Sequence, residues 1–354
     1  MNITIAPHSK GGIRSVVEGY ENNGFFERHH VTIIWSYEDG GFLLRQYVLL
    51  QALIRFIALL IKHQFKADSI NLVHCHVAAH GSFFRKALFA MIARAFKKPV
   101  IWHLHASQMK VFYDQQGVWG KRFIHMQFER AHTVIVLSEQ WRKFISEIAP
   151  RARIAVVPNC VNVMPPRNAT IKPAPHILSL GVVGERKGSY DLINAFAKVL
   201  KVYPEAKLTL AGNGEVAQAQ QLVNTLGLQN HVELTGWIDA NARKMLLERA
   251  TIYALPSYNE GLPVSVLEAM GASLPVVTTP VGGLPDLIEH GINGILITPG
   301  DITQLSEALM SLITDLKNSI KIANAGYETV KNHYSQEVVM PLLNQIYQSL
   351  HNKV

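Results

Sequence analysis

The feature of this sequence that most constrains its fold is a regular alternation of short apolar runs with helical patterns. In the first half the runs fall at Ile3–Ala6, Val31–Trp35, Leu72–His76, Val100–Leu104, Val134–Leu137 and Ile154–Val157. They restart at Ile177–Leu180, Leu208–Leu210, Val232–Leu234, Ile252–Leu255, Val276–Thr278 and Ile295–Ile297. This alternation is typical of parallel sheets with helices on both faces. The sequence therefore predicts an α/β protein made of two doubly wound, Rossmann-like domains.

A proline-rich stretch from Met164 to Pro175 separates the two sets of runs. We expect a first domain over 1–163, a linker over 164–175 and a second domain over 176–335, followed by one more helix. A chain of 354 residues with 48% hydrophobic and 17% charged residues suits two cores of ordinary size. Ligands of such sheets bind beyond the carboxyl ends of the strands, so each domain is expected to offer a site there.

The composition disfavours several classes of protein. The formal charge is +8, but the basic residues are scattered and no zinc-finger, helix-turn-helix or RNA-binding motif accompanies them, so we expect no nucleic-acid partner. Only Cys75 and Cys160 are present, which favours a reducing compartment over a disulfide framework. The N-terminal MNITIAPHSKGG lacks the basic flank and long apolar core of a signal peptide. These observations predict a cytoplasmic protein.

Two basic, apolar helical stretches, 42–66 and 83–98, bear on membrane association. The basic residues of the first stretch are Arg45, Arg55, Lys62 and Lys66. Charges inside so short a segment argue against a membrane span. One interpretation is that both stretches are ordinary helices that cover a sheet. The other is that they dock the protein on the inner face of an anionic membrane.

The segment from Pro256 to Thr279 holds two glutamates on either side of a Gly-Leu-Pro turn. We expect Glu260 in the loop that leaves a buried strand and Pro263 as the first helical residue, where a missing N–H costs nothing. Glu268 then lies about 7.5 Å further along the helix axis, at about 1.5 Å per residue. Backbone amides at Gly261 and its neighbours would face outward and suit a diphosphate or a sugar. The simpler alternative pairs Glu268 with a lysine of a neighbouring helix and leaves Glu260 in solvent.

This segment, PSYNEGLPVSVLEAMGASLPVVTTPVGGLPDLIEHGINGILI, resembles the donor-binding segment of the family 4 glycosyltransferases, which are retaining enzymes of the GT-B fold. The resemblance implies two Rossmann-like domains that face each other across a cleft, with a C-terminal helix, 336–354, that crosses back to the first domain. It also implies that Glu260 acts at the transferred sugar and that Glu268 binds the ribose. The remaining donor-binding residues expected in this turn are Gly261, Leu262 and Pro263.

The second domain opens with LSLGVVGERKGSYD, in which a strand ends at Gly181 and a helix starts near Ser189. Arg186 and Lys187 lie in the intervening loop, where a cation meets the diphosphate that leaves the donor sugar. In the family this loop carries an arginine and a lysine for the phosphates. Here Lys187 matches, whereas Val182 stands at the arginine position and Arg186 is the candidate substitute. Without the family resemblance, Arg186 and Lys187 can be explained simply as solvated loop residues.

The resemblance places further donor-binding residues at the ends of other strands. In TGWID, Trp237 and the backbone of Ile238 are expected beside the nucleobase, although an aromatic residue at a strand end is more often part of a core. The motif SKGGIRS places Gly11 and Gly12 after the first strand, where absent side chains admit a ligand to the backbone.

One histidine is a candidate catalytic residue of the first domain. In WHLHASQ, His105 stands just past the end of a strand, and His105-Ala106-Ser107 fits the family's pattern for a histidine that approaches the transferred sugar. His103 shares a face of the strand with it, because side chains alternate along a strand. The resemblance favours His105, and a purely structural histidine is the simpler alternative.

These observations predict a retaining hexosyltransferase that moves a sugar from a UDP- or GDP-sugar to a glycan or lipid-linked acceptor in bacterial surface polysaccharide synthesis. The predicted catalytic residues are His105, Lys187 and Glu260. Because no Asp-x-Asp motif is present and Lys187 serves the diphosphate, we predict no cofactor and no required metal. Two alternatives are another GT-B enzyme, such as a sugar-nucleotide epimerase or a phosphorylase, and a catalytically silent scaffold, which the valine at position 182 would allow.

Overall fold

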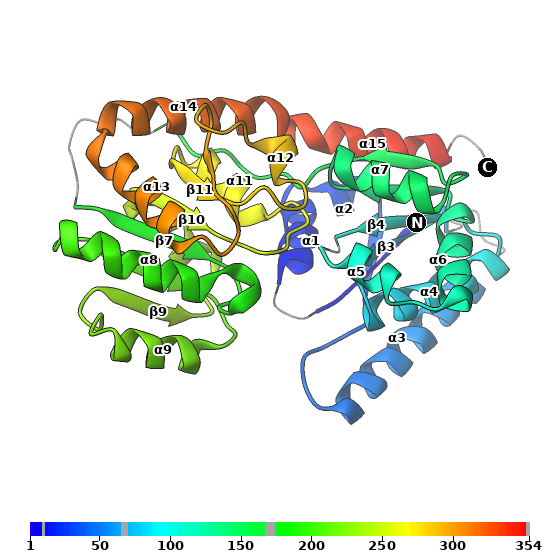
Figure 1. The fold of residues 1–354 in the computed structure, drawn as a ribbon. Helices are drawn as coiled ribbons and strands as arrows, with labels where there is room; N and C mark the ends of the chain where they lie inside the picture. The colour runs from blue at the N-terminus through cyan, green and yellow to red at the C-terminus, as the bar shows by residue number, and fades with distance from the viewer. Residues whose placement is uncertain (9–10, 65–69, 106, 167–173, 352–354) are drawn as a thin grey trace. The chain divides into compact units, whose positions relative to one another are not determined.

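The computed structural model describes residues 1–8, 11–64, 70–105, 107–166 and 174–351, and it divides into two compact units (Figure 1). The first unit comprises Met1–Asn159 with Gln336–Val354, and the second comprises Cys160–Ser335. Each unit is built on one parallel six-stranded sheet, so the α/β, doubly wound architecture predicted from the sequence is confirmed. Cys160 to Val163, which the sequence assigned to the first domain, belong to the second unit because Val161 forms a parallel β-bridge with Ser335.

The strands of the first unit coincide closely with the apolar runs of its sequence. They are β1 Asn2–Ala6, β2 Val31–Trp35, β3 Leu72–Val77, β4 Val100–Leu104, β5 Thr133–Val136 and β6 Ile154–Val156. The helices are α1 Gly12–Asn22, α2 Phe25–Arg28, α3 Phe42–Lys62, α4 Gly81–Ala95, α5 Met109–Asp114, α6 Val118–Glu129, α7 Glu139–Ile148 and α15 Gln336–His351. The strand order is β2-β1-β3-β4-β5-β6. The chain therefore changes direction across the sheet between β1 and β3, the position where such sheets bind ligands.

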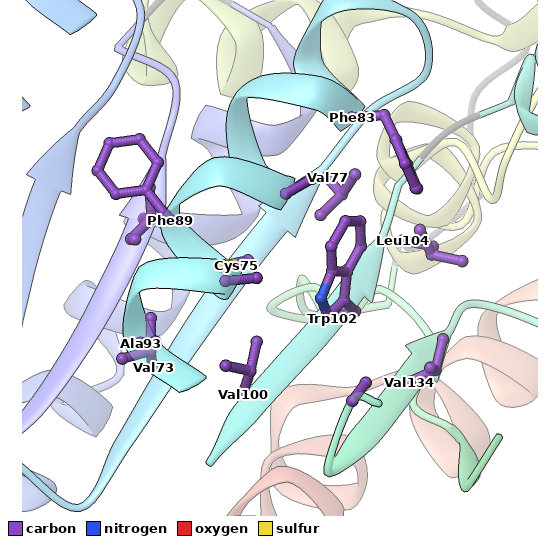
Figure 2. Packing of buried hydrophobic residues seen from close by; sticks show 14 of the residues in the cluster. Val73, Cys75, Val77, Phe83, Phe89, Ala93, Val100, Trp102, Leu104 and Val134 are labelled. Atoms are coloured by element: carbon purple, nitrogen blue, oxygen red, sulfur yellow. The ribbon is translucent and has the colours of Figure 1, made fainter. Parts of the chain in front are cut away.

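One face of this sheet carries the apolar core. Alternate residues of β3 and β4 point toward α4, as Figure 2 shows for Val73, Cys75 and Val77 on β3 and for Val100, Trp102 and Leu104 on β4. Phe83, Phe89 and Ala93 of α4 pack on them. All these side chains are buried, and burying a large apolar side chain contributes roughly 1.5–3 kcal/mol.

The residues between these, on the opposite face, are His74 and His76 on β3 and Ile101 and His103 on β4. Aromatic side chains from α1, α2 and α15 cover this face: Tyr20 lies against the rings of His76 and His103, and Phe25 packs edge-on against Tyr347. Helix α15, the last of the chain, is held here by hydrogen bonds that its Gln336 and Asn344 side-chain oxygens accept from Asn23 and His29. The helix that follows the second unit in sequence therefore belongs to the first unit.

The second unit repeats the plan. Its strands are β7 His176–Leu180, β8 Lys207–Ala211, β9 Val232–Gly236, β10 Ile252–Leu255, β11 Val276–Thr278 and β12 Ile295–Leu296. Its helices are η1 Glu185–Lys187, a 3-10 turn, and α8 Ser189–Val202, α9 Val216–Thr225, α10 Ala240–Arg249, α11 Val264–Gly271, α12 Leu284–Leu287, α13 Ile302–Thr314 and α14 Leu316–His333. The order β12-β11-β10-β7-β8-β9 places the change of direction between β7 and β10. The loops that follow these two strands are the predicted donor loops.

The two basic, apolar stretches differ in the structure. Helix α4 is an ordinary sheet-covering helix, because six of its residues are buried, including Lys86, whose ammonium donates to the hydroxyl of Ser36. Docking of the 83–98 stretch on a membrane is therefore not supported. Helix α3 buries only Ala52, Phe56 and Leu60. Within the described part of the chain, α3 alone is long and apolar enough, by length and composition, to cross a membrane. Lys66, the last basic residue of that stretch, lies outside the described residues.

Candidate functional site

The clearest cluster of predicted site residues lies between the β7 and β10 loops of the second unit. The Lys187 ammonium is 2.6 Å from Glu260 Oε1, and the hydroxyl of Ser257 donates to the same oxygen at 2.7 Å. The side chains of Lys187 and Glu260 are only 14% and 6% exposed. Glu260 is therefore a buried, paired carboxylate, and the alternative that left it in solvent is wrong.

Glycines allow these loops to approach each other closely. A Cβ atom on Gly188, which has φ +68°, would lie 2.1 Å from the carbonyl oxygen of Pro256. A Cβ on Gly282, which has φ +60°, would lie 1.9 Å from the carbonyl oxygen of Glu260. A side chain on Gly188 would push the β7 and β10 loops apart, one on Gly282 would press the loop after β11 against Glu260, and either would strain the backbone. The sequence thus fixes the distance between the loop that carries Lys187 and the loop that carries Glu260.

Arg186 is engaged in holding the two loops together. Its guanidinium donates to the carbonyl of Asn259 at 3.0 Å, and its own carbonyl accepts from the amide of Tyr258 at 2.9 Å. Val182, at the family's arginine position, is 50% exposed. The structure therefore assigns Arg186 a contact within the protein, and it leaves the position of the family arginine open to solvent.

Glu268, on α11, forms an ion pair with Arg243 of α10 at 2.9 Å. The simpler alternative from the sequence paired Glu268 with a lysine of a neighbouring helix. The structure shows such a pair, but the partner is an arginine. Burial raises the pKa of Glu268, and the adjacent Arg243 opposes this shift. The guanidinium keeps this partly buried carboxylate, whose side chain is 20% exposed, available as a hydrogen-bond acceptor.

The Gly-Leu-Pro turn between the two glutamates differs from its prediction. Gly261, Leu262 and Pro263 are all buried, so the outward-facing amides expected there are not evident. Pro263 is the N-cap, and α11 begins one residue later, at Val264. Helix boundaries set by proline are commonly shifted by one residue in this way.

Trp237 follows β9 at the edge of the second sheet, and 51% of its surface is exposed. The reading that placed this aromatic residue in the core is therefore wrong. Ile238 lies between Trp237 and Asp239, which caps α10 through a hydrogen bond to the amide of Ala242. An exposed indole next to a fixed backbone is suited to stacking on a nucleobase.

Gly11 and Gly12, at the start of α1 in the first unit, are both exposed. An added Cβ on either would meet no described atom within 4 Å. The packing of the described chain does not require glycine at these positions, in contrast to Gly188 and Gly282. The bare backbone leaves open space, as a ligand would need. Ser9 and Lys10 of the same motif lie outside the described residues, as does Ala106 after His105.

His105 lies one residue beyond β4 and is part of a group of four stacked histidines. His76 Nδ1 and His105 Nε2 are 2.9 Å apart, His74 Nε2 and His103 Nδ1 are 3.2 Å apart, and His74 Nδ1 is 2.9 Å from the hydroxyl of Tyr347. Burial lowers the pKa of His105 to about 3. Burial, with the neighbouring His105, lowers the pKa of His74 to about 3. The four rings are therefore neutral near pH 7, and His105 acts as a hydrogen-bonding group.

Three of these histidines, His74, His76 and His103, bring one ring nitrogen each within 4.8 Å of one another, a spacing from which a metal ion can be held. In the structure each of these rings bonds through at least one nitrogen to another ring or to Tyr347, and the rings are stacked, whereas Nε2 of His76 and Nε2 of His103 are buried without a hydrogen-bond partner in the described part of the chain. We therefore interpret them as a network of neutral imidazoles. Whether the enzyme works without a metal stays a prediction.

The comparisons with known proteins agree with the fold. Two family models match the chain: Glycosyltransferase Family 4 over residues 10–164 and Glycosyl transferases group 1 over residues 164–329. The amylovoran biosynthesis glycosyltransferase AmsK of Erwinia amylovora is 29% identical over 316 residues, which cover 78% of this chain and 77% of that protein. An uncharacterized glycosyltransferase of Methanocaldococcus jannaschii is 32% identical over 160 residues, 45% of this chain and 41% of that protein.

Solved structures establish the class of fold. Sucrose-phosphate synthase from Thermosynechococcus elongatus aligns with a TM-score of 0.83 at 19% identity and covers 100% of this chain and 99% of that one. Anabaena HepE, solved in complex with UDP, aligns with a TM-score of 0.75 at 19% identity over 99% of each chain. The fold is the two-domain GT-B fold. The two family models together match the chain from residue 10 to residue 329. The chain therefore belongs to the family 4, or group 1, glycosyltransferases.

Sequence reasoning missed three partners of the site residues. Ser257 stands three residues before Glu260, so its contact was visible in the motif itself. His76 belongs to the alternating LVHCHV run, whose pattern matches that of WHLH on the neighbouring strand. Arg243 gave no local signal, because it reaches Glu268 from another helix.

Proposed function

We propose that the chain is a retaining glycosyltransferase that moves a hexosyl group from a UDP- or GDP-sugar to a glycan or lipid-linked acceptor in polysaccharide biosynthesis. The observation that carries this proposal is the Lys187–Glu260 pair at the β7/β10 change of direction, which joins two motifs that resemble those of the family. The name of AmsK, an amylovoran biosynthesis enzyme, supports the polysaccharide setting, and the UDP complex of HepE supports a nucleotide-sugar donor. These likenesses favour transfer over epimerisation, phosphorolysis or a silent scaffold.

The charges of the second unit fit the steps of such a reaction. The bond between the sugar and the diphosphate breaks, and negative charge grows on the leaving phosphate, where the Lys187 ammonium stabilises it. Glu260, held by Ser257 and Lys187, accepts a hydrogen bond from a hydroxyl of the transferred sugar. Glu268, held by Arg243, accepts one from the ribose. Trp237 stacks on the base beside the backbone of Ile238.

The acceptor hydroxyl attacks the anomeric carbon from the face that the phosphate leaves. Its proton passes to the departing phosphate oxygen, so the configuration is retained without a protein nucleophile. Neutral His105 hydrogen-bonds a hydroxyl of the sugar. The proposal includes no metal, because Lys187 provides the positive charge at the phosphate.

We further propose that the protein works on the cytoplasmic face of a membrane, which it contacts through α3. Large apolar side chains of this helix are exposed: Phe42, Leu43, Leu44, Tyr47, Leu50, Ile54 and Ile61. Arg45, Arg55 and Lys62 lie on the same helix. A helix that combines apolar and basic side chains binds an anionic bilayer surface.

The proposed function is tested by a screen of UDP- and GDP-sugars for nucleotide release, with and without lipid-linked and glycan acceptors. We expect one donor to release its nucleotide only when an acceptor is present, and the product to keep the anomeric configuration of the donor in its NMR spectrum. Donor consumption without acceptor would instead indicate an epimerase or hydrolase. A failure to bind either UDP or GDP by calorimetry would indicate a scaffold.

A further inference from the structure

A pocket of about 650 Å³ lies in the first unit at the change of direction between β1 and β3. Gly11 and Gly12, after β1, form part of its wall, and Ala78, after β3, forms another part. The remaining wall includes three arginines from three different helices: Arg14 of α1, Arg45 of α3 and Arg85 of α4. The topology therefore gathers residues that are widely separated in the sequence.

Two of these arginines have no acidic partner. Arg14 is paired with Glu18 at 2.6 Å, but in the described part of the chain no carboxylate lies within ion-pair distance of Arg45 or Arg85. Both instead lie over the ring of Tyr37, with the guanidinium carbons 5.5 Å and 4.5 Å from its centre. The Nε atom of Arg85 is buried and has no hydrogen-bond partner among the residues that the structure describes. Two guanidinium groups held together without a counter-ion favour a bound anion.

Backbone dipoles add to this positive charge. The first residues of three helices line the pocket, Gly12 of α1, Phe42 of α3 and Gly81 of α4, and each helix has at least 11 residues. Helix N-termini carry partial positive charge and unbonded amide groups. The arginines and the three N-termini together match a phosphate or diphosphate group.

The mouth of the pocket is apolar and open. Phe42 lines the pocket and is 73% exposed, and the neighbouring Leu43 is 82% exposed. Leu44 and Tyr47 continue this exposed surface along α3. A nucleotide sugar has no apolar chain that would cover such side chains, whereas a lipid phosphate joins an anionic head to one.

We propose that this pocket is the acceptor site and that the acceptor is a lipid-linked phosphate or diphosphate, whose anionic group binds Arg45 and Arg85 while its lipid chain lies along the exposed start of α3. This inference rests on the proposed glycosyl transfer, because it names the acceptor of that reaction. Tyr37 fixes both guanidinium groups before the ligand arrives.

The test measures binding of the full chain to vesicles. Phosphatidylcholine vesicles that contain a polyprenyl diphosphate are compared with phosphatidylcholine vesicles that contain phosphatidylglycerol at the same surface charge. We expect a preference of about ten- to hundredfold for the diphosphate vesicles, as expected for one or two charge-assisted hydrogen bonds. The variant Arg45→Gln/Arg85→Gln should lose this preference. Arg55→Gln, on the exposed part of α3 but outside the pocket lining, should lower binding to both kinds of vesicle alike and so keep the preference.

Single variants keep the test informative if the double variant folds poorly. Arg45 is exposed, so Arg45→Gln removes the charge without touching the core, and Arg85→Lys keeps a charge but loses the paired donors. Both should lower the preference. Thermal unfolding of each variant shows whether it is folded.

Three results would overturn the proposal. Equal binding to both vesicles at equal charge would leave α3 as a general membrane surface. Inorganic pyrophosphate that binds as tightly as the vesicle-borne lipid would indicate a site for soluble phosphates. A matching loss of UDP and GDP affinity in the double variant would assign the arginines to the donor. A chain that binds no nucleotide but still prefers diphosphate vesicles would refute the proposed function, and it would leave the pocket as a lipid-diphosphate binding site without an acceptor role.

Discussion

The two candidate sites occupy the same position in their sheets, yet their charges are arranged in opposite ways. In the second unit Lys187 is paired with Glu260 and Glu268 with Arg243, and Gly188 allows the loops to touch. In the first unit Arg45 and Arg85 carry charge without an acidic partner among the described residues, and the glycines leave open space. The second unit thus holds its polar groups in place before a ligand arrives. The first unit keeps positive charge that a ligand must balance.

The largest expected effect comes from Lys187→Ala. Turnover should fall about 10²- to 10³-fold, because the lost ammonium stabilises charge that grows as the bond to phosphate breaks. Donor affinity should fall less than turnover. Steady-state kinetics and nucleotide calorimetry measure the two quantities separately.

A control is needed because the same change leaves Glu260 buried without its partner. Glu260→Gln with Lys187→Ala removes both charges and should restore stability to thermal unfolding but not turnover. Unchanged turnover in Lys187→Ala would show that the pair holds the loops and takes no part in the chemistry.

The histidine network should make the first unit sensitive to acid. Above pH 6.5 His74 and His105 are neutral both folded and unfolded, so they add no pH dependence. Between pH 6.5 and about 3 the unfolded chain binds protons that the folded chain excludes, so the free energy of unfolding falls as the pH falls. Each histidine lowers the free energy of unfolding by about 1.4 kcal/mol per pH unit in this range. At pH 5 the two histidines together lower it by an amount on the order of 2–4 kcal/mol.

Urea unfolding at pH 7.5 and pH 5.0 measures this loss. His74→Leu removes one titrating group together with its bond to Tyr347, so the variant should be less stable at pH 7.5 but should lose less stability on acidification. Equal pH dependence in parent and variant would mean that these histidines are not the acid-sensitive groups.

Glu268→Ala should weaken nucleotide binding about ten- to hundredfold, since a carboxylate that accepts a hydrogen bond contributes roughly 1.5–3 kcal/mol. Arg243→Ala should weaken it less, because the Glu268 carboxyl is still present but loses the group that orients it and opposes the rise of its pKa. Glu260→Ala should spare nucleotide affinity and reduce turnover. Calorimetry with UDP and GDP separates these outcomes, and parental affinity in Glu268→Ala would refute the ribose contact.

Neutralising Arg55 and Lys62 together should weaken binding to anionic vesicles. Each basic residue near an anionic surface contributes about 1 kcal/mol, and salt reduces this term. Vesicle sedimentation at two salt concentrations measures it, with neutral vesicles as the control. Sedimentation that depends on neither lipid charge nor these residues would direct attention to a soluble glycan acceptor.

The smallest expected effect is a gain. Because Arg186 is bonded to Asn259 and Val182 is exposed, Val182→Arg should supply a second cation at the phosphate and raise kcat/KM by about two- to fivefold, as for an exposed ion pair worth 0.5–1 kcal/mol. Val182→Met adds comparable length without charge and should change nothing. No gain from the arginine would mean that Lys187 alone suffices.

The fold could be predicted because twelve apolar runs mark the strands almost to the residue, and buried parallel strands need such runs. The donor loops could be predicted because Lys187 matches one motif of the family and Glu260 and Glu268 lie in another. The ion pairs could not be predicted. Lys187 and Glu260 are 73 residues apart in the sequence, and they come together only because β7 and β10 are neighbours in the sheet. The same holds for Arg14, Arg45 and Arg85, which only the β1/β3 change of direction brings to one pocket.

One measurement tests the division of labour between the two units most directly: hydrogen–deuterium exchange of the intact chain with UDP or GDP, and separately with a short-chain polyprenyl diphosphate. We predict that the nucleotide protects amides in the 181–188 and 256–263 loops. We predict that the lipid diphosphate protects amides near Gly12 and Gly81. Protection of the same loops by both ligands, or of neither set by the nucleotide, would contradict the account.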